Sequence, residues 1–250
     1  MIPSTTAPAP PPAAPVPAFA GDFEAHLTVR PSATAGADEA LQRYAADHGM
    51  KFTDILLDRG RTPSQPMLTL RRSGTLPDVR EAVEGAARGL GGAGFTVVRT
   101  KIEAAPWAEG VPETDAEAAV LGSHYYFEHH LKLLLTPGTD LVALAGLAAA
   151  HRAHLSRNAR RVRADGRAER FVTQRCRAVG RRTAGARLDA LVAAVGAAGY
   201  TVVSEEREFV VLDSDESLDA GWIDETDGTG ATGCISGIGD SNKDGEGTGA

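Results

Sequence analysis

Two short segments of the chain each carry a carboxylate and an imidazole two residues apart. One reads Phe-Glu-Ala-His-Leu at 23–27, and the other reads Phe-Glu-His-His-Leu at 127–131. Side chains at positions i and i+2 of a β-strand lie on the same face, so each Glu would stand beside its His. Such a pair can work as general acid and base, or it can bind Zn²⁺, Mn²⁺ or Fe²⁺. The candidate catalytic residues are His26, His130, Glu24 and Glu128.

The two segments belong to an internal duplication. They are separated by 104 residues, and Gly-Phe-Thr-Val-Val at 94–98 recurs as Gly-Tyr-Thr-Val-Val at 199–203, an offset of 105. Glu103 and Glu208 are also 105 residues apart. Two matches at nearly one offset indicate two copies of one unit. Glu103 and Glu208, together with His26 and His130, are the candidate ligands of a divalent metal, with Zn, Mn, Fe and Mg as alternatives.

Each copy predicts the same order of elements, β-α-β-β-α-β. In the first copy, apolar periodicity and turn residues predict strands at 23–30, 52–58, 67–71 and 95–103 and helices at 38–48 and 76–90. In the second copy they predict strands at 126–135, 160–163, 170–176 and 200–212 and helices at 140–156 and 187–198. This order is typical of the ferredoxin-like motif, an antiparallel sheet with both helices on one face.

The predicted fold class is therefore α+β, with two tandem ferredoxin-like (βαββαβ) repeats related by a pseudo-twofold axis. We expect their two antiparallel sheets to face each other across a cleft or closed barrel, because a sheet face of mixed polarity is usually covered. The predicted organisation is a disordered Pro/Ala-rich leader (1–21), a first repeat (22–105), a linker (106–123), a second repeat (124–223) and a disordered acidic Gly-rich tail (224–250).

Strand alternation selects further candidates for the shared face. Thr28 follows His26 at the same spacing at which Lys132 follows His130. In a ferredoxin-like sheet the last strand lies antiparallel beside the first, which brings Lys101 towards His26. We therefore expect Lys132, Lys101 and Thr28 to bind the substrate. Two other interpretations remain open: a solvated polar sheet face, or structural ion pairs and hydrogen bonds that bridge the two halves.

An Arg-rich stretch extends from 152 to 187. It holds twelve arginines against Asp165 and Glu169. One explanation is a solvated surface whose arginine content reflects GC-rich coding. The other is recognition of a phosphorylated or otherwise anionic small molecule, since guanidinium matches phosphate oxygens. Nucleic acid is less favoured as a partner, because no aromatic residues interleave for base stacking.

The acidic residues are concentrated at the end of the chain. The formal charge of −7 arises there, because from Asp213 onwards there are ten acidic residues and one Lys.

Other sequence features indicate the compartment. Two cysteines cannot build a disulfide framework, the leader lacks the features of a secretory signal, and no apolar run is long enough to span a membrane. These features favour a cytoplasmic protein without a membrane partner. They do not indicate an oligomeric state.

Three resemblances cover a few residues each. His26-Leu27-Thr28-Val29 resembles the His-x-Thr strand of two-histidine phosphoesterases, in which both histidines act on a phosphodiester; Lys132 departs from that pattern in the second copy. Glu128-x-His130-x-Lys132 is similar to the Glu-x-Glu-x-Lys opening of triphosphate tunnel enzymes, which bind a metal and a polyphosphate within a barrel. The His strand and closing Glu of each repeat resemble vicinal oxygen chelate proteins, whose repeat lacks a second helix.

Together these features predict an enzyme with a His/Glu site between the repeats that acts on a small phosphorylated or anionic substrate. Phosphoesterase-like hydrolysis, with or without a divalent metal, is the first expectation. The alternative is a non-catalytic protein whose sheets bind a ligand or a protein partner.

Overall fold

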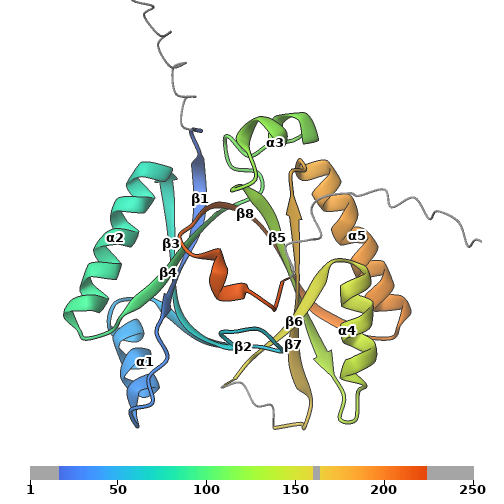
Figure 1. The fold of residues 1–250 in the computed structure, drawn as a ribbon, viewed down its shortest axis with the longest axis horizontal. Coiled ribbons are helices and arrows are strands. Elements are labelled where there is room, and N and C mark those ends of the chain that lie inside the picture. Colours follow the sequence, from blue (N-terminus) through green and yellow to red (C-terminus); the bar gives the residue numbers. More distant parts are fainter. Residues whose placement is uncertain (1–16, 160–163, 224–250) are drawn as a thin grey trace, which may run out of the picture.

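The computed structural model describes residues 17–159 and 164–223. Within these residues, eight strands form one closed antiparallel barrel in the order β1-β3-β2-β6-β7-β5-β8-β4 (Figure 1). The strands are β1 (Ala20–Val29), β2 (Lys51–Leu57), β3 (Ser64–Thr75), β4 (Val97–Ala104), β5 (Tyr126–Leu135), β6 (Ala153–Asn158), β7 (Ala168–Arg177) and β8 (Thr201–Asp213). The helices are α1 (Ala37–Asp47), α2 (Leu76–Gly92), α3 (Asp115–Leu121), α4 (Leu141–Ala150) and α5 (Arg181–Ala197).

The expectation of two separate sheets facing each other is wrong. β4 pairs with β8 and β2 pairs with β6, so the strands of both halves form one continuous antiparallel sheet. The fold is α+β with this single sheet. β8 runs past its pairing with β5, and its last residues, Leu212 and Asp213, pair with β4. Each of the eight strands has a paired neighbour on both sides, and the apolar pattern of a single strand does not encode this pairing between halves.

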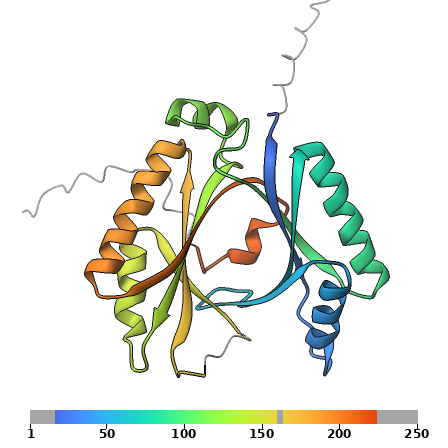
Figure 2. The same cartoon turned by 180° about the vertical axis from the view of Figure 1, so that it is seen from behind.

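The helices lie on the outside of the barrel. α1 and α2 cover one side, and α4 and α5 cover the opposite side (Figures 1 and 2). Apolar side chains of the strands point outward to meet them: Leu27 belongs to the core under α1 and α2, and Leu131 to the core under α4 and α5. Because alternate residues point the other way, the residues between them line the interior, and most of these are polar.

One predicted helix is too long. The prediction of 140–156 overshoots, because α4 ends at Ala150 and the chain resumes as β6 at Ala153. Arg152 adopts a positive φ of 55°, which terminates the helix. β6 provides the strand that pairs with β2 of the other half. The strand predicted at 160–163 lies outside the described residues.

The predicted disordered ends lie mostly outside the described residues. This applies to 224–250 and to the leader up to residue 16. Of the rest of the predicted leader, Phe19 is buried in the core, and β1 begins at Ala20.

In the parts of the chain that are described, none of the helices has the length and apolarity needed to cross a bilayer.

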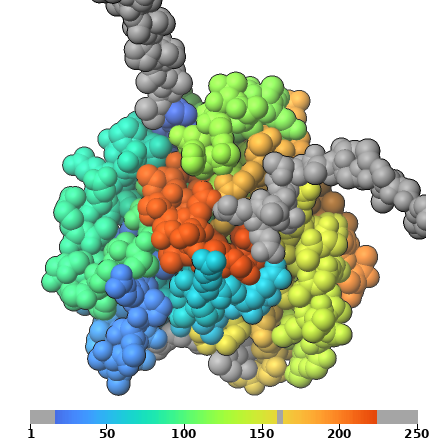
Figure 3. Space-filling model, viewed as in Figure 1, coloured from blue at the N-terminus to red at the C-terminus, as the bar shows by residue number. Residues whose placement is uncertain are grey.

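After β8 the chain turns back over the barrel. Residues 214–223, here called the strap, include a 3₁₀ helix, η1 (Glu216–Asp219), that lies in the middle of the ring of strands (Figure 1). Figure 3 shows the strap covering the centre of this face. Trp222 is buried and donates from Nε1 to the backbone oxygen of Leu155 at 2.8 Å, and the N–H of Arg61 donates to Ala220 at 3.0 Å. The strap thus closes this end of the barrel.

Candidate functional site

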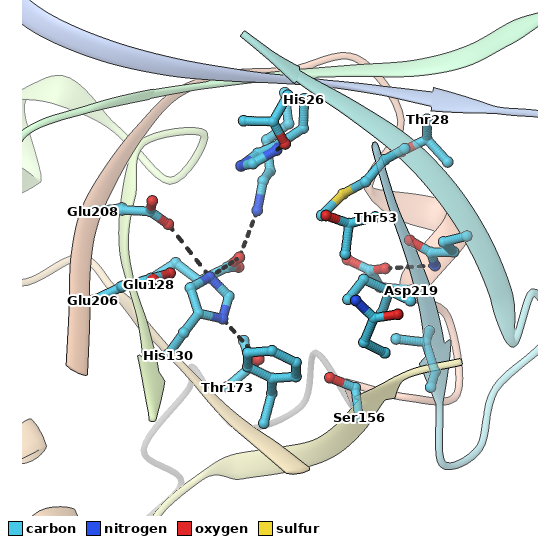
Figure 4. A pocket seen from close by; sticks show the side chains of 18 of the residues that line it. His26, Thr28, Thr53, Glu128, His130, Ser156, Thr173, Glu206, Glu208 and Asp219 are labelled. Carbon is cyan, nitrogen blue, oxygen red and sulfur yellow. Dashed lines mark hydrogen bonds and ion pairs between the residues drawn. The ribbon is translucent and has the colours of Figure 1, made fainter. Parts of the chain in front are cut away.

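The inward side chains enclose a cavity of about 180 Å³ inside the barrel (Figure 4). The cavity brings together almost all the residues predicted from the sequence. Those that line it are Glu24, His26, Thr28, Lys101, Glu128, His130, Lys132 and Glu208. Glu103 lies buried beside the cavity, in contact with His26 and Lys101. Their roles in substrate or metal binding stay predictions.

The ring of His26 is held at both nitrogens. Nδ1 is 2.9 Å from the hydroxyl of Thr69 on β3, and Nε2 is 2.8 Å from a carboxylate oxygen of Glu103 on β4. The strand register explains these contacts, because His26 stands opposite Thr69 on β3, and Glu103 on β4 stands opposite Glu24, which is two residues from His26 on the same face. The imidazole is therefore fixed in orientation by its two neighbouring strands.

His130 repeats this arrangement in the second half. Nδ1 is 3.0 Å from the hydroxyl of Thr173, while Nε2 is 3.3 Å from Glu128 and 3.4 Å from Glu208. Burial by itself lowers the pKa of His130, but hydrogen bonds to the two carboxylates, and their charges, outweigh burial and raise this pKa to about 10. At neutral pH His130 is therefore an imidazolium.

A buried ionic network joins the two halves. Lys101 on β4 lies 2.6 Å from both Glu103 and Glu128, and Arg175 on β7 donates to Glu128 at 2.5 Å. Burial opposes the ionisation of both carboxylates. Lys101 and His26 nevertheless hold the pKa of Glu103 well below its ordinary value. Arg175 and Lys101 do the same for the pKa of Glu128. Both groups therefore remain carboxylates, which suits a positioning role better than proton transfer.

Glu208 differs from these two carboxylates. Burial and the negative charge of Glu103 raise its pKa, and His130 only partly offsets them. Its oxygen lies within 4.8 Å of donor atoms of Glu24 and His26, and also within 4.8 Å of donor atoms of Glu103 and His130. Negative charge is therefore concentrated around Glu208, and a bound cation would relieve it.

The two halves are not equivalent in environment. Arg71 and Arg175 stand at matching register positions opposite Glu24 and Glu128. The side chain of Arg71 is 80% exposed and pairs with Glu24, whereas that of Arg175 is 7% exposed and also reaches Asp219 of the strap. The open side of the network therefore lies at Glu24 and the closed side at Glu128.

Two other predicted substrate contacts also face the cavity. Thr28 is buried, and Lys132 holds its ammonium 5.4 Å from the centre of the Phe171 ring and 3.9 Å from a Glu169 oxygen. Lys101 is different, because its ammonium is already held between two carboxylates. Of the two predicted lysines, Lys132 is therefore the more loosely paired.

Sequence reasoning missed several residues of the site. Thr69 and Thr173 are 104 residues apart, as are Arg71 and Arg175, so the offset of the histidines, extended to β3 and β7, would have identified them. Asp219 has no such signal, because the strap follows the last repeated strand.

The chain matches no family model and no curated protein.

Proposed function

We propose that the barrel interior is the active site of a cytoplasmic enzyme that hydrolyses a small phosphorylated substrate with a divalent metal ion. The observation that carries this proposal is the convergence of Glu24, His26 and Glu208 in one cavity, with donor atoms within 4.8 Å of one another. Imidazole and carboxylate are the ligands of Zn²⁺ and Mn²⁺ in hydrolytic sites.

Among the described residues, two His/Glu groups could hold a metal, and the one with Glu24, His26 and Glu208 is the better supported. The other includes Glu103, which is already bound by Lys101, and His130, which carries a proton at neutral pH. A metal at the first group would replace the hydrogen bond between His26 and Glu103. Because metal ligands bind in their deprotonated form, the apparent metal affinity should rise with pH.

The remaining groups suit hydrolysis of a phosphate ester. A divalent cation would polarise a phosphoryl oxygen and acidify a water molecule. As the water oxygen bonds to phosphorus, Glu206, which stands opposite His130 in the sheet and lines the cavity, would accept the water proton. As the bond from phosphorus to the leaving oxygen breaks, the His130 imidazolium would donate its proton to that oxygen. Lys132 would neutralise charge on the phosphate.

One observation favours the alternative function, ligand binding without catalysis. Nε2 of each histidine already faces a carboxylate, so the cluster could serve only to hold the two halves together around a bound anion. The two functions differ in whether the cavity binds metal and turns over a phosphate ester.

The test is metal binding by the chelator-treated full chain. We expect Zn²⁺ or Mn²⁺ to raise the melting temperature, with stabilisation of about 2.7 kcal/mol when the metal is at 100 times its Kd. His26→Ala and Glu208→Gln should abolish the rise, while His124→Ala, an exposed histidine outside the cavity, should retain it.

Hydrolysis of p-nitrophenyl phosphate and pyrophosphate is then measured with and without the metal. Turnover that is lost in His26→Ala and His130→Ala supports the enzyme. Metal binding without turnover of any phosphate ester would favour the ligand-binding alternative, and no metal effect at all would remove the proposed centre.

A further inference from the structure

Asp219 of the strap is held by two buried arginines. Its Oδ2 lies 2.5 Å from a terminal nitrogen of Arg175 and 3.0 Å from one of Arg99, and its Oδ1 accepts from the amide of Gln65 at 3.1 Å. Each arginine also has a carboxylate partner on the barrel, Glu128 for Arg175 and Asp213 for Arg99. The Asp219 carboxylate thus accepts from guanidinium N–H groups of both arginines, in addition to their carboxylate partners on the barrel.

Two buried guanidinium groups meet at Asp219. On the barrel, Arg99 pairs with Asp213 and Arg175 with Glu128, and Glu128 is shared with Lys101, which also pairs with Glu103. Asp219 is the carboxylate that both arginines contact. The arginines in turn hold its pKa below the ordinary value although burial opposes this.

Comparison of the two halves indicates that this carboxylate is an addition to the repeated unit. Arg71, at the position that matches Arg175, has Glu24 as its carboxylate neighbour and stays largely exposed. Asp219 comes from a segment beyond the last barrel strand, and that segment lies across the end of the cavity. The strap therefore covers the end of the cavity and places the Asp219 carboxylate between Arg99 and Arg175.

We infer that Arg99 and Arg175 form an anion-binding subsite for the phosphoryl group of the substrate, and that Asp219 occupies this subsite while the strap is closed. The inference deepens the proposed function, on which its choice of substrate rests. Two guanidinium groups and an amide match the several oxygens of a phosphate group better than the two oxygens of a carboxylate. Both arginines line the same cavity as His130 and Glu208. A bound phosphate would displace Asp219 and loosen the strap.

The chain carries its own reporter for this displacement. Trp222 of the strap is 5% exposed, whereas Trp107, the other tryptophan of the sequence, is 73% exposed. In a Trp107→Phe protein the fluorescence comes from Trp222 alone. The indole Nε1 of Trp222 donates to the backbone oxygen of Leu155 on the barrel, so strap release would break this contact and expose the indole.

The test uses inorganic phosphate and pyrophosphate with the full chain in the presence of a chelator, so that metal binding plays no part. In Trp107→Phe we expect either anion to shift the Trp222 emission to the red, and sodium chloride at equal ionic strength to leave it unchanged. By calorimetry, Asp219→Asn should bind phosphate at least tenfold more tightly, because the competing charge is gone.

Asp219→Asn should also melt lower than the unmodified chain, and phosphate should restore the loss. Asp215→Asn is the matched control, because the Asp215 side chain accepts from the backbone N–H and the hydroxyl of Ser217 within the strap; it should bind phosphate like the unmodified chain. Equal phosphate affinity with and without Asp219, or an unmoved Trp222 emission at saturating phosphate, overturns the inference. If Asp219→Asn does not fold, the emission measurement decides alone. If phosphate fails these measurements while metal still binds, only the anion subsite is contradicted. If phosphate behaves as expected but no metal binds, only the metal centre is contradicted.

Discussion

His26 and His130 each bond through Nδ1 to a threonine that lies 43 residues further along the chain. The two rings come from β1 and β5, which are separated in the barrel by β4 and β8. Glu208 of β8 lies within 4.8 Å of a donor atom of each ring. Two matching His–Thr pairs thus supply two oriented imidazoles to one cavity, and their surroundings decide what each can do.

The two threonines should orient the rings. We expect Thr69→Val and Thr173→Val each to lower the free energy of unfolding by about 1–3 kcal/mol, because a buried ring nitrogen loses its partner while the side-chain volume is kept. Urea denaturation measures this loss. Thr201→Val, at an exposed strand position, is the control and should change little; an equal effect of all three would contradict the orienting role.

Lys101 should be the main link between the halves. Lys101→Met leaves Glu103 and Glu128 buried with less compensating charge, and we expect it to cost about 3–5 kcal/mol of stability. Because both carboxylates have depressed pKa values in the fold, their contribution is present above their unfolded pKa near 4.5 and is lost as the pH falls below it. The variant should therefore lose less relative to the unmodified chain in acid than at neutral pH.

Denaturation curves at neutral and acid pH measure both effects. Lys51→Met, at an exposed lysine that lines the same cavity, serves for comparison. A loss in Lys101→Met no larger than in Lys51→Met would show that the network contributes little to stability.

His130 should make the stability fall in mildly alkaline solution. Its pKa is raised from 6.5 to about 10 in the fold, so its contribution is fully present below pH 6.5 and is lost as the pH rises through about 10. The stability difference between the unmodified chain and His130→Gln should shrink over this range. NMR titration of the ring protons should find His130 still protonated well above pH 6.5; deprotonation near pH 6.5 would refute the prediction.

Arg71 and Arg175 form a matched pair for measuring the two environments. Arg175→Met should cost about 3–5 kcal/mol, because it leaves Glu128 and Asp219 short of a buried cation. Arg71→Met should cost about 0–1 kcal/mol, because Arg71 is exposed and its ion pair with Glu24 is screened by solvent. Both are measured by urea denaturation, and similar losses would mean that the two ends of the cavity are alike.

What the sequence by itself determined is which residues share a face and which share a register. Alternation in the strand at 23–30 predicted that Glu24, His26 and Thr28 lie together, and the repeat predicted a matching set at Glu128, His130 and Lys132. All six side chains line one cavity. These predictions depended on local rules, the twofold period of a strand and the constant offset between copies, which are independent of how the halves assemble.

The tertiary structure alone decided that the halves share one closed sheet, and therefore which charges meet. Pairing of β4 with β8 brings Lys101 of one half to Glu128 of the other, and the strap brings Asp219 to Arg175. Neither contact follows from a local pattern, since each joins segments from different units or from outside the repeat. The physical reason is that strand edges pair by backbone hydrogen bonds, which carry no signature in the side-chain sequence.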